Sequence, residues 1–199
     1  MKKDFFSNSK FSFTSLVLIL LTCFACQKDE ALFNSDVQTE AIQFRTSPPA
    51  VPAILEVPAG NEVSKHVYAD GVQVYRSTET SPGVYAWVFK EPIATLYNNA
   101  GYNGEAGTHY AGPTWESNSG SKVVGARLQG ATVDPNAIPW LLLGAVSSSG
   151  NGIFLGTTYI QRVNTVGGKA PTTPAANAGN VGQEINVPYT AEYFFYRAE

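Results

Sequence analysis

From residue 60 onward the chain is a succession of short strand-like runs separated by glycine-containing turns, and this pattern constrains the fold most. All 18 glycines of the sequence lie in this part. The runs alternate apolar and polar residues, or are rich in β-branched and aromatic residues, as strands are. No amphipathic helix of ten or more residues is found there. The pattern predicts an all-β fold: a single antiparallel β-sandwich or closed β-barrel of about nine or ten short strands.

Two local signals raise the expected number of strands. Asp70-Gly71 tolerates the positive φ of a tight hairpin turn, so we expect it to divide residues 63–77 into two strands. Pro92 cannot donate a backbone hydrogen bond, so we expect it to divide residues 84–98 in the same way.

Two longer segments are typical of turns and loops, residues 130–139 and residues 165–188. The second is longer than a structural connection needs, which favours a functional or disordered loop.

The first 25 residues have the three parts of a secretory signal peptide: a basic start, an apolar run over residues 16–21 and small residues near a cleavage point. The apolar stretch is shorter than the ~20 residues of a membrane-spanning helix. Its end, Cys23-Phe24-Ala25-Cys26, resembles the bacterial lipoprotein processing site, in which cleavage precedes a cysteine that is then lipidated. We therefore expect a lipid at Cys26 that holds the protein to a membrane. Simple cleavage near Ala25 is the alternative.

The residues after Cys26 point to a location and to a tether. Residues 27–30, Gln-Lys-Asp-Glu, resemble the signal that sends lipoproteins of Bacteroidetes-type bacteria to the cell surface. An ordinary solvated charge run is the alternative. Residues 26–52 lack glycine and end in a proline-rich stretch, typical of an extended, semi-rigid spacer. We expect an exported outer-membrane lipoprotein, exposed at the surface, whose single β domain spans residues 53–199.

Charge and residue usage exclude several classes of function. Without its leader the chain carries 10 basic and 15 acidic residues, a net charge of −5, and no basic cluster, so we expect no nucleic-acid partner. Neither a dinucleotide fingerprint nor a phosphate-binding loop is present, and we expect no cofactor. Only His66 and His109 are available as histidine ligands, and no cysteine follows Cys26, so we expect no metal site and no disulfide.

The densest group of chemically active side chains lies between residues 107 and 116. His109 and Glu116 are candidates for a general base and a general acid. Alternatively, Tyr110 and Trp115 stack on a sugar ring while His109 and Glu116 bind its hydroxyl groups. In a purely structural alternative, the two aromatic side chains belong to the core and a backbone carbonyl satisfies His109.

A second polar group follows in residues 161–169. Arg162 and Lys169 are candidates for binding an anion, and Gly167-Gly168 lets backbone amides approach a ligand. The alternative is a glycine turn, with Arg162 paired to an acid such as Glu116.

Five segments in the same order resemble the domain of unknown function 3455 family, over roughly residues 54 to 196. They are residues 71–75, 109–116, 138–143, 161–171 and 187–191. The resemblance implies a secreted protein of a bacterial and fungal family without an established activity. Some fungal members carry a malate dehydrogenase label, which the missing dinucleotide fingerprint does not support. Members often have one cysteine where Ser77 stands here and another within residues 175–182; this chain has neither.

Together these features predict a cell-surface lipoprotein that binds a carbohydrate or an envelope component. The candidate ligand-binding residues are His109, Tyr110, Trp115, Glu116, Arg162 and Lys169. A secreted hydrolase or lyase that uses Glu116 with His109 or Tyr110 is one alternative. A structural envelope protein is another. The sequence leaves open whether the protein is an enzyme.

Overall fold

The computed structural model describes residues 47–199. The expected signal peptide, the lipidation site at Cys26 and the tether up to residue 46 lie outside the described residues. Within residues 47–199, no helix has the length and hydrophobicity that crossing a bilayer requires.

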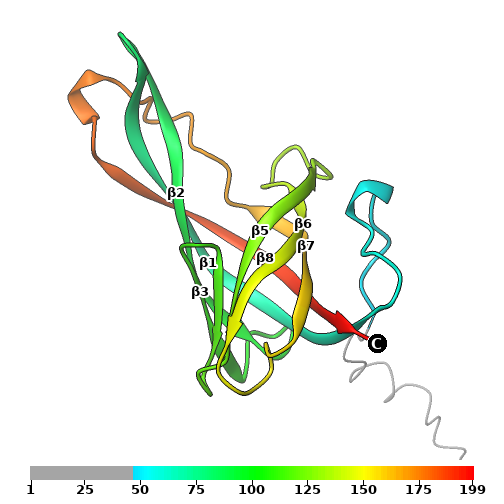
Figure 1. Ribbon diagram of the computed structural model, residues 1–199. Helices are drawn as coiled ribbons and strands as arrows, with labels where there is room; N and C mark the ends of the chain where they lie inside the picture. Colours follow the sequence, from blue (N-terminus) through cyan, green and yellow to red (C-terminus); the bar gives the residue numbers. More distant parts are fainter. Residues whose placement is uncertain (1–46) are drawn as a thin grey trace, which may run out of the picture. The chain divides into compact units, whose positions relative to one another are not determined.

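Eight antiparallel strands form one closed barrel, in which each strand pairs with the next and the last returns to the first (Figure 1). The strands are β1 (Asn61–Ser81), β2 (Val84–Tyr97), β3 (Glu105–Tyr110), β4 (Thr114–Ser117), β5 (Lys122–Ala131), β6 (Trp140–Ser149), β7 (Thr157–Gly167) and β8 (Glu184–Ala198). Two single 3₁₀ turns, η2 (Ala53–Leu55) and η3 (Ala178–Asn180), accompany them. The expected all-β fold is confirmed, and it is a barrel.

The expected division at Asp70-Gly71 is wrong, because β1 runs straight through these residues. Gly71 pairs with Ala94 on one side and Tyr189 on the other. A Cβ atom at this position would lie 2.1 Å from the carbonyl oxygen of Ile93. Glycine at this position therefore allows the backbones of β1 and β2 to come close together, and no turn forms here.

The expected division at Pro92 is also wrong, since β2 continues through it. The register of β1 and β2 skips Lys90, which makes a bulge two residues before the proline. At Pro92, β2 is paired with β1 only, because the pairing with β3 begins at Ala94. Proline is tolerated at bulges and at unpaired edges. These two continuous strands explain why eight strands are found instead of nine or ten.

The hairpin of β1 and β2 continues beyond the barrel as an arm, residues 74–91, which is the long projection in Figure 1. β8 pairs with the arm as far as Arg76, and beyond that residue the arm has two strands. Residues 168–183, which we call the strap, lie along this arm. The backbone of Ser77 exchanges hydrogen bonds with Gly182 and Gln183, and its hydroxyl donates to Asn180 Oδ1 at 2.7 Å. Trp87 Nε1 donates to the carbonyl of Pro174 at 2.8 Å. The long loop expected over 165–188 is thus shorter, and it is bound to the arm.

The interior of the barrel holds the main core, and one end of the barrel is closed. Phe154, in the loop between β6 and β7, is fully buried, and its ring lies 4.5 Å from that of Phe195. Its backbone N–H donates to the hydroxyl of Ser121, which also shares a hydrogen bond with Ser117. These contacts close this end of the barrel and make it a cup.

A second apolar cluster lies on the outer face of β7 and β8 and is built on Val163, Phe194 and Tyr196. The chain before β1 packs against it with Val51 and Val57, so Val51, which falls in the predicted tether, contacts the barrel. The adjacent Leu55 is buried, and its carbonyl accepts a hydrogen bond from Gln161 Nε2 at 2.7 Å. The β domain therefore includes residues upstream of its first strand.

Candidate functional site

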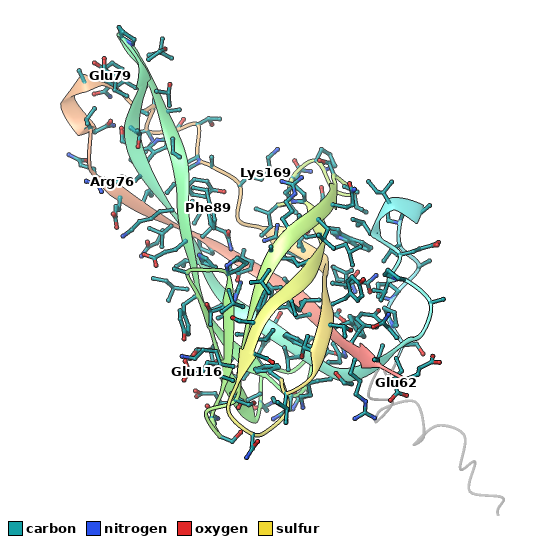
Figure 2. All side chains as sticks on the ribbon, viewed as in Figure 1. Glu62, Arg76, Glu79, Phe89, Glu116 and Lys169 are labelled. Carbon is teal, nitrogen blue, oxygen red and sulfur yellow. The ribbon has the colours of Figure 1, made fainter. Side chains whose placement is uncertain are left out.

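A cavity of about 530 Å³ opens into the barrel at the end opposite Phe154. Its rim includes the turn between β3 and β4, the loop between β5 and β6, and the base of the arm at Phe89 and Lys90. Figure 2 labels Phe89 where the arm meets the barrel. Most of the wall is apolar, with Ile138, Leu141 and Leu143 among its residues. Three of the candidate site residues line this cavity: His109, Trp115 and Arg162.

His109 and Trp115 lie directly opposite each other on β3 and β4, so both side chains point into the barrel. Their rings stack 4.4 Å apart at 11°, and they are 3% and 1% exposed. His109 Nδ1 lies 2.8 Å from the carbonyl of Thr114 and must donate to it, which leaves Nε2 as an acceptor. Burial lowers the pKa of His109 from 6.5 to about 3; the bond to Thr114 opposes this shift and the charge of Arg162 adds to it. The imidazole is therefore neutral at neutral pH.

Arg162 on β7 lies opposite Tyr193 on β8, on the same inner face. Its Nε and Nη2 atoms donate to the carbonyl of Pro139 at 3.1 and 2.9 Å, which fixes the guanidinium at the cavity wall. The expected alternative partner, Glu116, bonds other residues. The ring of Tyr193 also contacts those of His109 and Trp115 edge-on, at 5.1 and 5.3 Å. Arg162, Tyr193 and the stacked pair are thus one continuous group.

Four buried polar atoms of residues 47–199 lack a hydrogen bond of good geometry: Gln73 Nε2, Trp115 Nε1, Tyr189 Oη and Tyr193 Oη. Three of them have polar neighbours nonetheless, since the Tyr193 hydroxyl lies near Arg162 and Tyr189, and Tyr189 lies near Gln73. Gln73, Trp115 and Tyr193 line the cavity. Burial raises the pKa of both tyrosines, and the positive charge of Arg162 counteracts part of this rise. Buried polar groups are normally satisfied by the protein, by ordered water or by a ligand, so the indole N–H of Trp115 and its neighbours are available to a molecule that enters the cavity.

Tyr110 and Glu116 lie on the outer face of the same hairpin, because each is adjacent in sequence to a residue that points inward. The Tyr110 hydroxyl donates to Glu116 Oε2 at 2.5 Å, and Lys122 Nζ lies 3.0 Å from the same oxygen. The bonds from Tyr110 and then Lys122 lower the pKa of Glu116, so it is a carboxylate at neutral pH. Neither the proposed acid–base pair of His109 and Glu116 nor a joint platform of Tyr110 and Trp115 is assembled, since their members face opposite sides.

Lys169 lies at the start of the strap, and its Nζ atom donates to the carbonyl of Pro135. It is not part of the cavity wall. Figure 2 shows Lys169 and Glu116 at well-separated places on the molecule. The amide of Gly168 donates to Pro188 and its carbonyl accepts from Tyr75, so this backbone binds the chain itself.

Gln73 and Tyr193 also line the cavity, and neither was among the residues expected there. Tyr193 belongs to the closing aromatic run, which is typical of core packing. A signal was present for Gln73. Gln73 lies on the same face of its strand as Val67, Ala69 and Gly71, because every second residue of a strand points to the same side. It is therefore a polar residue among small and apolar ones.

No group of three or more His, Cys, Asp or Glu side chains in residues 47–199 is arranged to hold a metal ion.

Comparison with known proteins identifies the family. The model of the family described as "Protein of unknown function (DUF3455)" matches residues 58–197. That range covers the eight strands, apart from the last residue of β8, and the whole cavity wall. No curated protein matches the chain, and no solved structure does.

Proposed function

Because the chain belongs to this family of proteins of unknown function, its activity has to be inferred from its own residues, and we propose that it is a binding module that takes a small molecule into the barrel. The observation that carries the proposal is the set of polar groups at the cavity: the indole N–H of Trp115 has no hydrogen-bond partner, and Gln73 Nε2 and Tyr193 Oη have none of good geometry. An unsatisfied buried polar group costs roughly 1–3 kcal/mol. A ligand that bonds these atoms recovers that cost.

The dimensions of the cavity support the same function. Ligand pockets commonly have volumes of about 300–1,000 Å³, and the cavity of about 530 Å³ lies within this range. Eight-stranded barrels are just large enough to hold one small ligand. An oligosaccharide or another envelope component would bind by inserting one end into the cup, since the candidate aromatic residues offer no shared outer surface.

The three tryptophans of the chain provide the test. In ¹H–¹⁵N spectra of the purified full-length protein, each indole N–H gives its own peak, and Trp115→Phe assigns the one from the cavity. A diverse fragment library at millimolar concentration should include compounds that shift the Trp115 peak. Peaks of Trp87 and Trp140 serve as internal controls. If no compound shifts the Trp115 peak, the proposed function is refuted.

A pair of matched variants shows where the compounds bind. Ala111→Phe places a ring at the cavity rim, and Ala100→Phe places one in an exposed turn between β2 and β3. We expect Ala111→Phe to abolish the shifts and Ala100→Phe to leave them unchanged. Equal effects of the two variants would show that the compounds act elsewhere.

We further infer that binding takes place at the bacterial surface, with the chain anchored by a lipid at Cys26. The support is the sequence of the leader and of residues 27–30. Labelled palmitate should be incorporated into the wild-type chain and into Cys23→Ala, but not into Cys26→Ala. Protease added to intact cells should remove the domain. Labelling of Cys26→Ala, or protection from the protease, would contradict the anchor or the surface location, respectively.

A further inference from the structure

We propose that the ligand is a small organic acid whose carboxylate binds the guanidinium of Arg162 inside the barrel. This inference rests on the proposed function and specifies the chemistry of the ligand. The charges of the cavity, its hydrogen-bond donors and its apolar wall support it.

The charge of the cavity wall is positive. Lys90, Arg127 and Arg162 line it, and no Asp or Glu does. Lys90 has acidic partners at the rim, Glu91 and Glu184, each at 3.1 Å. Among residues 47–199, no acidic side chain lies within ion-pair distance of either arginine. Arg127 is exposed to solvent, whereas Arg162 is half-buried. A neutral or cationic ligand would leave the charge of Arg162 uncompensated, whereas an anion would pair with it.

Arg162 is suited to be the anchor. The carbonyl of Pro139 accepts from two of its nitrogens and so holds the planar group in one orientation. A guanidinium has five N–H donors, so further donors remain for a carboxylate. A fixed, planar set of donors matches the two oxygens of a carboxylate better than a flexible ammonium group does.

The neighbouring polar groups that lack a hydrogen bond of good geometry are also donors. The indole N–H of Trp115 and the amide nitrogen of Gln73 only donate, and the hydroxyl of Tyr193 can donate. Tyr193 is the cross-strand neighbour of Arg162 and packs edge-on against Trp115. A ligand group that accepts several hydrogen bonds and carries negative charge satisfies this set, and a carboxylate has both properties.

The rest of the wall determines the body of the ligand. Ile138, Leu141 and Leu143 form an apolar surface beside the donors. This surface favours a compact apolar body over a phosphate ester or a fully hydroxylated sugar acid, whose polar groups would be desolvated without partners.

The test compares acids with their own amides, which have nearly the same shape but no charge. The probes are benzoate, cyclohexanecarboxylate and indole-3-acetate, each paired with its amide, with phenyl phosphate and glucuronate as the other anions. Binding to the purified full-length protein is followed by the Trp115 indole peak. The acids should bind roughly tenfold or more tightly than the amides, the difference expected for a charge-assisted hydrogen bond. Phenyl phosphate and glucuronate should bind more weakly than the apolar acids.

Variants locate the preference for acids. Arg162→Gln should reduce it to near unity, and Arg162→Lys should restore part of it. Arg197→Gln removes an exposed charge that bonds Glu62 outside the cavity, and it should leave the preference unchanged. Acids and amides that bind the wild-type protein equally well would overturn this inference while the proposed binding function stands. If glucuronate or phenyl phosphate binds more tightly than the apolar acids, the inference that the ligand has an apolar body is refuted. If neither acids nor amides shift the Trp115 peak, a carboxylate ligand is refuted, and the fragment library then decides the proposed function separately.

Discussion

Replacing His109 by asparagine should remove a large part of the protein's sensitivity to acid. In the folded protein the imidazole is buried against Trp115, and its pKa is about 3. In the unfolded chain the pKa returns to about 6.5. Below pH 6.5 the unfolded state therefore binds a proton that the folded state does not bind. As the pH is lowered from 6.5 towards 3, the free energy of unfolding decreases. Above pH 6.5 the residue is neutral in both states and contributes no pH dependence.

The magnitude follows from this difference in protonation. Each pH unit within the window is worth about 1.4 kcal/mol for one proton. Between pH 8 and pH 4.5 His109 alone should thus lower the free energy of unfolding by about 3 kcal/mol, nearly all of it below pH 7. Asparagine keeps a nitrogen near the position of Nδ1, so it retains the donor to Thr114 and does not titrate. The cavity that the smaller side chain leaves destabilises the variant equally at every pH.

The assay is urea unfolding of the wild-type protein and of His109→Asn, followed by tryptophan fluorescence at several pH values from 8 to 4.5. All other titratable groups are common to both proteins, so the difference between the two free energies isolates His109. The wild-type protein should lose its advantage over the variant as the pH falls. A difference that stays constant over the whole range would refute the reasoning, because it would mean that the folded protein protonates His109 as easily as the unfolded chain.

Three other substitutions test separate parts of the structure. Phe154→Ala should lower the free energy of unfolding by about 3–5 kcal/mol in urea, because it leaves a cavity at the closed end of the barrel. Leu155→Ala changes the exposed neighbour and is the control. Equal effects of the two variants would contradict the role of Phe154 in closing this end. Ser77→Ala removes one hydrogen bond to the strap, worth about 1 kcal/mol, and should speed hydrogen exchange of the Gly182 backbone amide several-fold. An unchanged exchange rate would show that the hydroxyl does not hold the strap. Glu116→Gln should leave ligand binding and the melting temperature nearly unchanged, because this carboxylate lies on the outer face of the barrel. A loss of binding would show that Glu116 takes part in the site.

The fold class could be predicted because alternation and turn residues are local signals. The misjudged glycine shows the limit of such signals. A glycine is needed where φ is positive, and it is also needed where two backbones come close. Asp70-Gly71 has the composition of a turn, but Gly71 stands between two paired strands, where a Cβ atom would meet Ile93. Only the register of distant strands distinguishes the two cases, and no local pattern contains it.

The candidate site illustrates the same limit. Adjacency in sequence grouped the four residues of the β3–β4 hairpin, but the alternation of a strand sends His109 and Trp115 inward and Tyr110 and Glu116 outward. That split could have been read from the sequence. Tyr193 reaches the same cavity from the far end of the chain, and its place beside Arg162 follows from strand pairing alone.

The pairing of β1 with β8 also has a consequence for the order in which the protein is made. β1 pairs with β8 from Asn61 to Arg76, so its outer edge has no partner until β8 has been synthesised. A chain that ended after the strap would expose one long edge on β1 and another on β7, and such edges pair readily with other chains. The cup therefore forms as a late, single event that joins residues far apart in sequence, which is intrinsically slow.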